Sequence, residues 1–136
     1  MKKHMGFSLI ELMIVAAIGG ILLAVAIPSY KTYVFKSHRA DALSALAQDQ
    51  TILERCYAQS FSYNGACSAR PAFPHNSTQG YYSINAVIGA ATFTLTATPI
   101  GTQVGDTTCA SIRVDQANQK TAVDSSGTSQ LVCWNL

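Results

Sequence analysis

The sequence predicts an α+β protein in which one long N-terminal helix packs on a small antiparallel sheet. Three observations lead to this fold class. Residues 7–27 are apolar apart from Glu11, residues 29–59 carry apolar side chains at helical spacing, and residues 82–123 alternate between apolar and polar side chains as strands do. An antiparallel sheet with one apolar face needs a cover, and the amphipathic half of the helix is the segment available to provide it.

The apolar segment is long enough to span the hydrocarbon core of a bilayer, which is about 30 Å thick, at about 1.5 Å per helical residue. Glu11 is the exception within it, because a carboxylate there costs roughly 2.5–3.5 kcal/mol on insertion scales. We therefore expect Glu11 to be functional and to have a cationic partner. Pro28 follows the segment, and we expect it to bend the helix without ending it.

Residues 29–59 are predicted to continue the helix as its amphipathic half. Leu43, Leu46, Leu53 and Tyr57 recur at helical spacing and are expected to face the sheet. Charged and amide side chains fill much of the rest of this amphipathic segment, and they include Arg39, Asp41, Gln48, Asp49 and Glu54. A solvated helix face is predicted for the basic residues Lys31, Lys36, Arg39 and Arg55.

Residues 60–79 are predicted to form a loop, because they contain Gly65, Pro71 and Pro74 among other turn-forming residues. Three aromatic side chains in this loop are expected to pack on the helix, and His75 is expected to be solvated. The three aromatic residues are Phe61, Tyr63 and Phe73.

The last third of the chain is predicted to hold four strands. Residues 82–87 and 92–97 flank a turn, and they are predicted to form a hairpin. Residues 108–114 are predicted to form a third strand, and residues 120–123 a short fourth strand.

The four cysteines lie outside the apolar segment, and an even set of this kind predicts two disulfides in an oxidising compartment. Three pairings are possible. We favour Cys56–Cys67 with Cys109–Cys133, since each of these closes a local loop. Zinc is the rival explanation, but no CxxC pair is present and the histidines are scattered.

The N-terminal run GFSLIELMIVAAIGGILLAVAIPSY resembles the N-terminus of type IV prepilins. The resemblance implies that a prepilin peptidase cuts after Gly6 and methylates the new N-terminal Phe7, that Glu11 is the acidic residue of the motif, and that Pro28 is the helix-kinking proline. It divides the chain into a removed leader (1–6), a transmembrane and filament-core helix (7–28) and a periplasmic or extracellular pilin domain (29–136).

The same resemblance implies two successive locations, first the bacterial inner membrane and then a pilus filament. It also implies other pilin subunits and inner-membrane assembly proteins as partners. Cleavage creates a cationic amine at Phe7, about one helical turn from Glu11. The family resemblance favours a pair between Glu11 of one subunit and this amine of its neighbour, and pairing offsets part of the cost of burying the carboxylate.

A second resemblance covers the C-terminal region. This region is similar to the PilE-type minor pilins at residues 94–99 (TLTATP), Gln103, Asp106, residues 108–109 and residues 133–134. The additional pair Cys56/Cys67 departs from their pattern. The expected function is that of a minor, structural or assembly subunit of a type IV pilus, involved in pilus biogenesis and hence in twitching motility, adhesion or DNA uptake. The alternatives are a major pilin, a DNA-uptake receptor displayed on the pilus and a secretion pseudopilin.

The charge count bears on the DNA alternative. The chain has nine Lys and Arg against seven Asp and Glu, and loss of the leader with Lys2 and Lys3 leaves seven of each. A nearly neutral protein argues against strong non-specific binding of nucleic acid, so this count disfavours DNA as a partner.

The sequence contains no catalytic constellation, so the protein is not expected to be an enzyme or to need a cofactor. Asp106, Asp115 and Asp124 lack the spacing of a calcium loop, and turn or surface roles are predicted for them.

Overall fold

The computed structural model describes residues 7–135, and it divides into two compact units, residues 1–34 and 35–136. One helix, α1 (Leu9–Ser60, 52 residues), runs through both units, and Pro28 lies inside it without ending it. The prediction of a long helix is therefore confirmed, and its predicted end at about residue 59 agrees with the observed end at Ser60.

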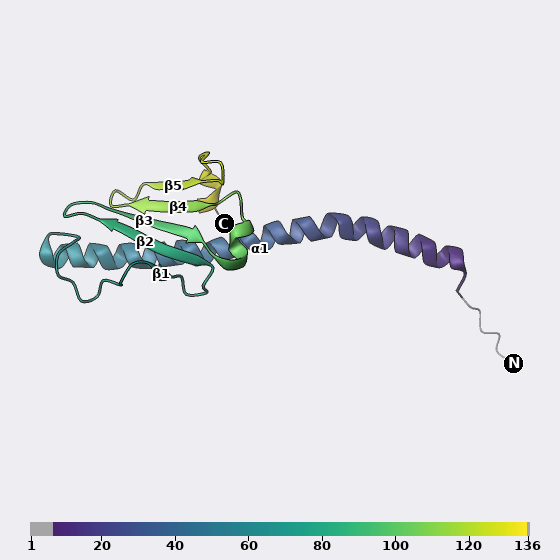
Figure 1. The fold of residues 1–136 in the computed structure, drawn as a ribbon, viewed down its shortest axis with the longest axis horizontal. Coiled ribbons are helices and arrows are strands. Elements are labelled where there is room, and N and C mark those ends of the chain that lie inside the picture. Colours follow the sequence, from purple (N-terminus) through teal and green to yellow (C-terminus); the bar gives the residue numbers. More distant parts are fainter. Residues whose placement is uncertain (1–6, 136) are drawn as a thin grey trace. The chain divides into compact units, whose positions relative to one another are not determined.

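Five strands follow in the second unit. They are β1 (His75–Asn76), β2 (Tyr82–Ile88), β3 (Phe93–Pro99), β4 (Ser111–Asp115) and β5 (Lys120–Val123). Figure 1 shows β2, β3, β4 and β5 side by side. Each strand pairs antiparallel with the next, so the sheet is a meander in the order β1-β2-β3-β4-β5. Two short 3₁₀ helices complete the unit, η1 (Gly101–Gly105) after β3 and η2 (Leu131–Trp134) at the C-terminal end.

The α+β fold class and the predicted hairpin are confirmed, with some differences in detail that include the unpredicted helix η2. The third strand begins at Ser111 and not at Thr108. Strand β1 and helix η1 were not predicted, because a two-residue strand and a five-residue turn of helix carry too little periodicity to be recognised.

The hydrophobic core lies between one face of α1 and one face of the sheet. Leu46 and Leu53 of α1 are fully buried, as are the inward residues Ile84, Leu95 and Ile112 of β2, β3 and β4. Along β3 the inward residues Phe93, Leu95 and Ala97 alternate with threonines, as the strand period of two requires. Leu43 and Tyr57 are half-buried against this core, so all four side chains predicted to cover the sheet do contact it.

Of the three loop aromatics, Tyr63 packs on the helix as predicted. Tyr63 is buried, with its ring centroid 4.5 Å from that of Tyr57, and Phe73 packs on the edge of the core. The prediction for Phe61 is wrong, because this side chain is 81 % exposed. Phe61 follows the last helical residue with φ of 51°, and this left-handed turn directs the chain away from the helix axis.

Candidate functional site

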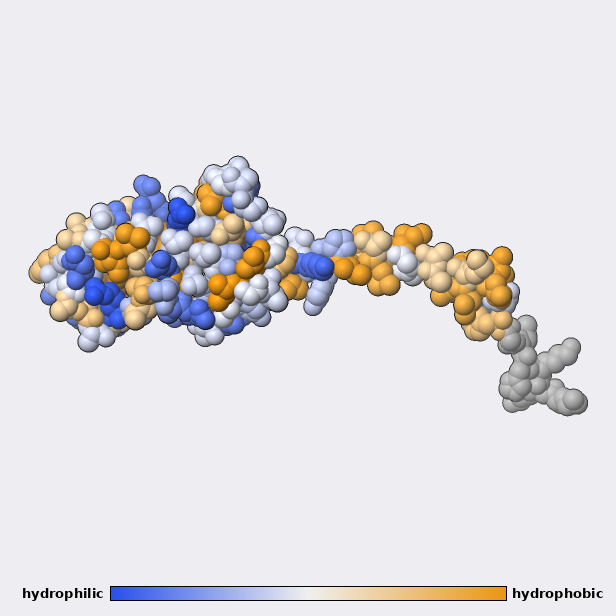
Figure 2. Space-filling view, viewed as in Figure 1, coloured by the Kyte–Doolittle hydropathy of each residue, from blue (hydrophilic) through white to orange (hydrophobic). Residues whose placement is uncertain are grey.

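The apolar part of α1 exposes large hydrophobic side chains on all of its faces. Residues 7–27 contain thirteen such side chains, and the helix is long and apolar enough to cross a membrane. Figure 2 shows this segment covered almost entirely by hydrophobic residues. A helix that is apolar all round requires lipid or other apolar helices as surroundings.

Glu11 lies in the first turn of α1, where a carboxylate interacts favourably with the helix dipole. Its backbone N–H donates to the carbonyl of Ser8 at 3.1 Å. Phe7 precedes the helix and is exposed, while Gly6 lies outside the described residues. The two ion pairs found among residues 7–135 involve other carboxylates, Asp106 and Asp49. Within residues 7–135, Glu11 therefore forms no ion pair.

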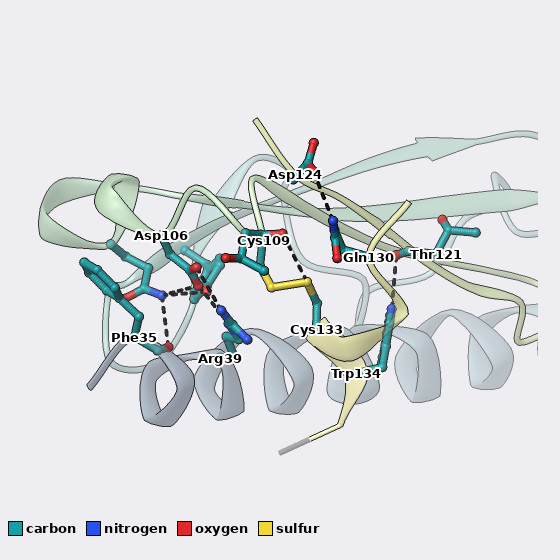
Figure 3. The surroundings of a disulfide bond; sticks show 12 residues. Phe35, Arg39, Asp106, Cys109, Thr121, Asp124, Gln130, Cys133 and Trp134 are labelled. Carbon is teal, nitrogen blue, oxygen red and sulfur yellow. Dashed lines mark hydrogen bonds and ion pairs between the residues drawn. A yellow bond between two sulfur atoms is a disulfide. The ribbon is translucent and has the colours of Figure 1, made fainter. Parts of the chain in front are cut away.

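In the second unit, a buried ion pair joins α1 to the segment after η1. The guanidinium of Arg39 donates to both carboxylate oxygens of Asp106, from Nε at 2.7 Å and from Nη2 at 2.8 Å. Both residues are almost completely buried. Figure 3 shows the pair next to the disulfide between Cys109 and Cys133. Bidentate geometry of this kind is the strongest that an arginine makes with a carboxylate.

Gln103 of η1 extends this network. Its amide nitrogen donates to the backbone carbonyl of Phe35 at 3.2 Å and to the hydroxyl of Tyr82 at 3.0 Å, and its amide oxygen lies 2.9 Å from Nδ1 of His38. The ring of His38 stacks on Tyr81 with 3.6 Å between centroids. One fully buried amide thus connects α1, β2 and η1.

Two further carboxylates of α1 point into the domain. Asp41 accepts hydrogen bonds from the hydroxyl of Ser77 and from the backbone N–H groups of Gln79 (3.1 Å) and Tyr81 (3.4 Å), which fixes the turn between β1 and β2. Asp49 lies 2.9 Å from Nε2 of His75. Burial raises the pKa of Asp49, while the charge of His75 and its hydrogen bond act in the opposite direction.

These contacts correct the predictions made for one basic residue of α1 and for two others. Arg39 is buried and not on a solvated face, Asp106 is buried and not a surface residue, and His75 is paired and not merely solvated. Asp41 and Asp49 of α1 are buried as well. A signal for Asp49 was available in the sequence, because it falls between Leu46 and Leu53 at helical spacing on the same face. Asp115 and Asp124 do act in turns, where each accepts backbone N–H groups.

The structure joins Cys56 to Cys67 and Cys109 to Cys133, the two pairs that the sequence favours. The first ties the end of α1 to the following loop, and the second ties the segment before β4 to η2. Next to the second, the indole N–H of Trp134 donates to the carbonyl of Thr121 at 3.0 Å, which holds η2 on the edge of β5 (Figure 3). Within residues 7–135, no three His, Cys, Asp or Glu side chains are placed to hold a metal ion together.

Comparison with known proteins gives matches along most of the chain. Residues 28–113 match the family described as "Type IV minor pilin ComP, DNA uptake sequence receptor", and residues 1–27 match the "Prokaryotic N-terminal methylation motif".

Individual relatives match over shorter stretches. The type IV major fimbrial protein FimA of Dichelobacter nodosus is 51 % identical over 51 residues, which are 38 % of this chain and 33 % of that protein. The prepilin peptidase-dependent protein D of Escherichia coli is 33 % identical over 87 residues, covering 64 % of this chain and 60 % of that protein. The chain thus spans about a third of the fimbrial relative. The structure of the non-core minor pilin PilV of Neisseria meningitidis superposes with a TM-score of 0.54 at 15 % identity, covering 71 % of this chain and 93 % of that one, and this likeness concerns the fold.

The Arg39–Asp106 pair predicts a large loss of stability when one partner is removed. Arg39→Ala leaves a buried carboxylate without its cation, and we expect the free energy of unfolding to fall by about 3–5 kcal/mol. Denaturation by urea, followed by near-ultraviolet circular dichroism, measures this change. Arg55→Ala, at an exposed position of the same helix, is the matched control and is expected to change stability by less than about 0.5 kcal/mol. Equal losses in the two variants would contradict the assignment.

The tyrosines predict how stability changes at high pH. Burial is the main cause that raises the pKa of Tyr82 to about 12, against about 10 in the unfolded chain. As pH rises, Tyr82 therefore loses its proton first in the unfolded state. The stability that Tyr82 contributes through this pKa difference is intact below pH 10 and is lost between pH 10 and 12, and it amounts to about 2–3 kcal/mol. Denaturation across this range checks the decline. In Tyr82→Phe the decline should become shallower but persist, because the pKa of Tyr63 is also raised to about 12.

Proposed function

Because the chain belongs to the type IV minor pilin ComP family, whose model covers residues 28–113, we propose that it is a minor subunit of a type IV pilus that also binds DNA on the pilus surface. The predicted resemblance to type IV pilins is confirmed by this match and by the methylation motif over residues 1–27. The observation that carries the pilus proposal is the exposed apolar surface of α1, since it needs either a bilayer or a bundle of similar helices around it.

Processing precedes assembly in this proposal. A prepilin peptidase cuts after Gly6 and leaves Phe7 as a methylated N-terminus, so that residues 1–6 are the leader, residues 7–28 the membrane and filament-core helix and residues 29–136 the exposed domain. The subunit waits in the inner membrane and then enters the filament through the inner-membrane assembly proteins and its contacts with other pilins. The match of residues 1–27 to the N-terminal methylation motif supports the processing step.

Glu11 selects the neighbour during assembly. Cleavage creates an α-amino group at Phe7, and this amine stays cationic near neutral pH. In an apolar helix bundle, a carboxylate without a cation is costly, and pairing with the amine of the adjacent subunit offsets part of that cost. The ion pair thereby stabilises one axial register between neighbouring helices relative to other registers.

DNA binding is supported by the distribution of charge over the second unit. The count over the processed chain is neutral, but three of the six Asp and Glu side chains in this unit (Asp41, Asp49 and Asp106) are buried and bonded internally. Of its basic residues only Arg39 is buried with them. Five cationic side chains remain wholly or partly exposed against three carboxylates; the cations are Lys36, Arg55, Arg70, Arg113 and Lys120, and the carboxylates are Glu54, Asp115 and Asp124.

This excess of exposed cations favours the binding of phosphate groups. Phosphate binding depends on cations that reach solvent, and carboxylates held by hydrogen bonds in the interior oppose it less than exposed ones. The surface is therefore more favourable to DNA than the neutral count implies.

The pilus proposal is tested at Glu11. We expect Glu11→Ala to be made, processed and held in the membrane, but to be absent from filaments, because its helix no longer has a carboxylate for the neighbour's amine. Immunoblotting of sheared filaments and of membranes measures the two pools. Ser8→Ala, which replaces a polar side chain about one turn before Glu11 by the same small residue, is the control and should enter filaments normally. Normal incorporation of Glu11→Ala would refute the role of this carboxylate.

The DNA proposal is tested by titration across a range of salt concentrations. The processed protein in detergent micelles should bind duplex DNA, with an affinity that falls as salt rises by a slope of about 0.9 per phosphate contacted. Arg113→Gln, on the exposed side of β4, is expected to lower that slope by about 1 if Arg113 contacts a phosphate. Thr98→Ala, exposed on the neighbouring strand β3, should leave the slope unchanged.

Binding is expected to be tighter for DNA from the organism that makes the protein than for unrelated DNA of equal length, as the family description of a DNA uptake sequence receptor implies. Absence of binding at micromolar protein, or binding that does not depend on salt, would remove DNA from the proposal and leave the pilus role intact.

A further inference from the structure

One edge of the sheet is left largely uncovered. Strand β1 pairs with β2 only at Ser83 and Ile84, although β2 continues for four more residues. The remainder of β2, residues 85–88, has a full partner in β3 on one side and no strand on the other. Figure 1 shows β1 as a short element beside the much longer β2. An edge of this kind is a template for another strand.

The backbone groups that face this edge belong to alternate residues of β2. The carbonyl of Tyr82 accepts the N–H of Ser77 from the β1 side, so Tyr82, Ile84, Ala86 and Ile88 direct their N–H and C=O groups to this edge. The N–H of Ala86 is bonded to the side-chain oxygen of its own neighbour Asn85, at 2.8 Å. A local bond of this type satisfies the donor in the free protein and has to be exchanged for a ladder bond when a strand is added.

A cleft of about 580 Å³ runs beside the uncovered edge, between Ala86 and Ile88 on one wall and residues 64–73 on the other. The second wall is fixed by three sets of bonds. Cys67 is joined to Cys56, Nη1 of Arg70 donates to the carbonyls of Tyr63 (2.9 Å) and Gly65 (3.2 Å), and the N–H of Tyr63 donates to the carbonyl of Ala90 at 3.0 Å. The cleft is therefore a built feature of the unit.

The size of the cleft fits one added strand. Four extended residues at about 3.3 Å each, a spacing of about 4.8 Å to the next strand and a layer about 10 Å thick enclose roughly 630 Å³. This volume is close to that of the cleft, and the four residues equal the uncovered length of β2. A double helix is too wide for a space of these dimensions.

The lining of the cleft indicates what the strand must carry. Arg70 is the one charged side chain among the lining residues, and its guanidinium engages the protein through Nη1 in both of its hydrogen bonds. The other lining side chains are mainly apolar and include Phe73, Ala72 and Ile88. A carboxylate complements Arg70, and small or β-branched apolar side chains complement the rest.

We propose that this cleft binds an extended segment of another protein, four or five residues long and apolar with one carboxylate, as an additional strand on β2. Backbone hydrogen bonds to Ala86 and Ile88 provide the affinity, and Arg70 and Phe73 provide the selectivity. On binding, a partner carbonyl replaces the Asn85 side chain as acceptor for Ala86. The proposal goes beyond the pilus and DNA roles, and neither its success nor its failure depends on them.

The test uses the processed full chain in detergent micelles, labelled with ¹⁵N, and the peptide acetyl-Thr-Val-Glu-Val-Thr-amide as the probe. Saturable shifts of the amide signals of Ala86 and Ile88 are expected. A peptide with Gln in place of Glu, and a peptide with N-methylated backbone amides, are each expected to bind at least tenfold more weakly.

Two variants separate the cleft from other surfaces. Ala72→Trp fills the cleft at an exposed lining position, and Ala86→Pro removes the edge donor, which an edge strand tolerates. Both are expected to weaken peptide binding at least tenfold. Ala117→Trp, exposed in the turn between β4 and β5, is the matched control for Ala72→Trp and should bind the peptide as the unaltered protein does.

Unchanged binding in Ala72→Trp or equal binding of the N-methylated peptide would overturn the proposal, as would the absence of any shift in the unaltered protein. If Ala72→Trp weakens DNA binding and the peptide does not bind, the cleft serves nucleic acid and the proposal is likewise wrong. Amide spectra of each variant establish that it is folded, and if Ala86→Pro is not, Ala72→Trp with its control carries the test.

Discussion

The second unit depends on one constraint, namely that a single face of α1 must fill the open side of a five-stranded sheet. That face is not purely apolar. Leu46 and Leu53 supply its hydrophobic contacts, while Arg39, Asp41 and Asp49 enter the interior with them. Each of these charged groups has a bonded partner from outside the helix, in Asp106, Ser77 and His75 respectively. Buried charges are tolerated only with such partners, so η1 and the β1–β2 turn have to be placed where they are.

The buried charges also alter what the surface presents. A neutral count of charged residues suggests a weak field and disfavours nucleic acid, but the count treats every residue as equally exposed. Because Asp41, Asp49 and Asp106 are held in the interior, the side chains that reach solvent are biased toward cations. The DNA function named in the family description is therefore compatible with a domain whose overall charge is small.

The apolar part of α1 poses a different physical problem from the rest of the chain. Its side chains are exposed on every face, so burial has to come from lipid or from other helices and not from the domain. A single carboxylate, Glu11, breaks this uniformity. In the proposed assembly it converts non-directional packing of apolar helices into a contact with one preferred register, because a charge in an apolar bundle is stable in few positions.

The sequence by itself determined the long helix, the hairpin, the α+β class and the prepilin-like N-terminus, and it favoured the two cysteine pairs that the structure contains. These features are local, since periodicity, turn residues and short spacings can be read without knowing what lies opposite. Only the tertiary structure decided that Arg39, Asp41, Asp49 and Asp106 are buried, that Phe61 is exposed and that β1 leaves half of β2 uncovered. The burial of these charges depends on residues far apart in the chain, up to 67 positions for Arg39 and Asp106. Whether a charged residue at helical spacing is solvated or buried depends on whether another part of the chain provides an ion-pair or hydrogen-bond partner. The tertiary fold determines the position of that partner.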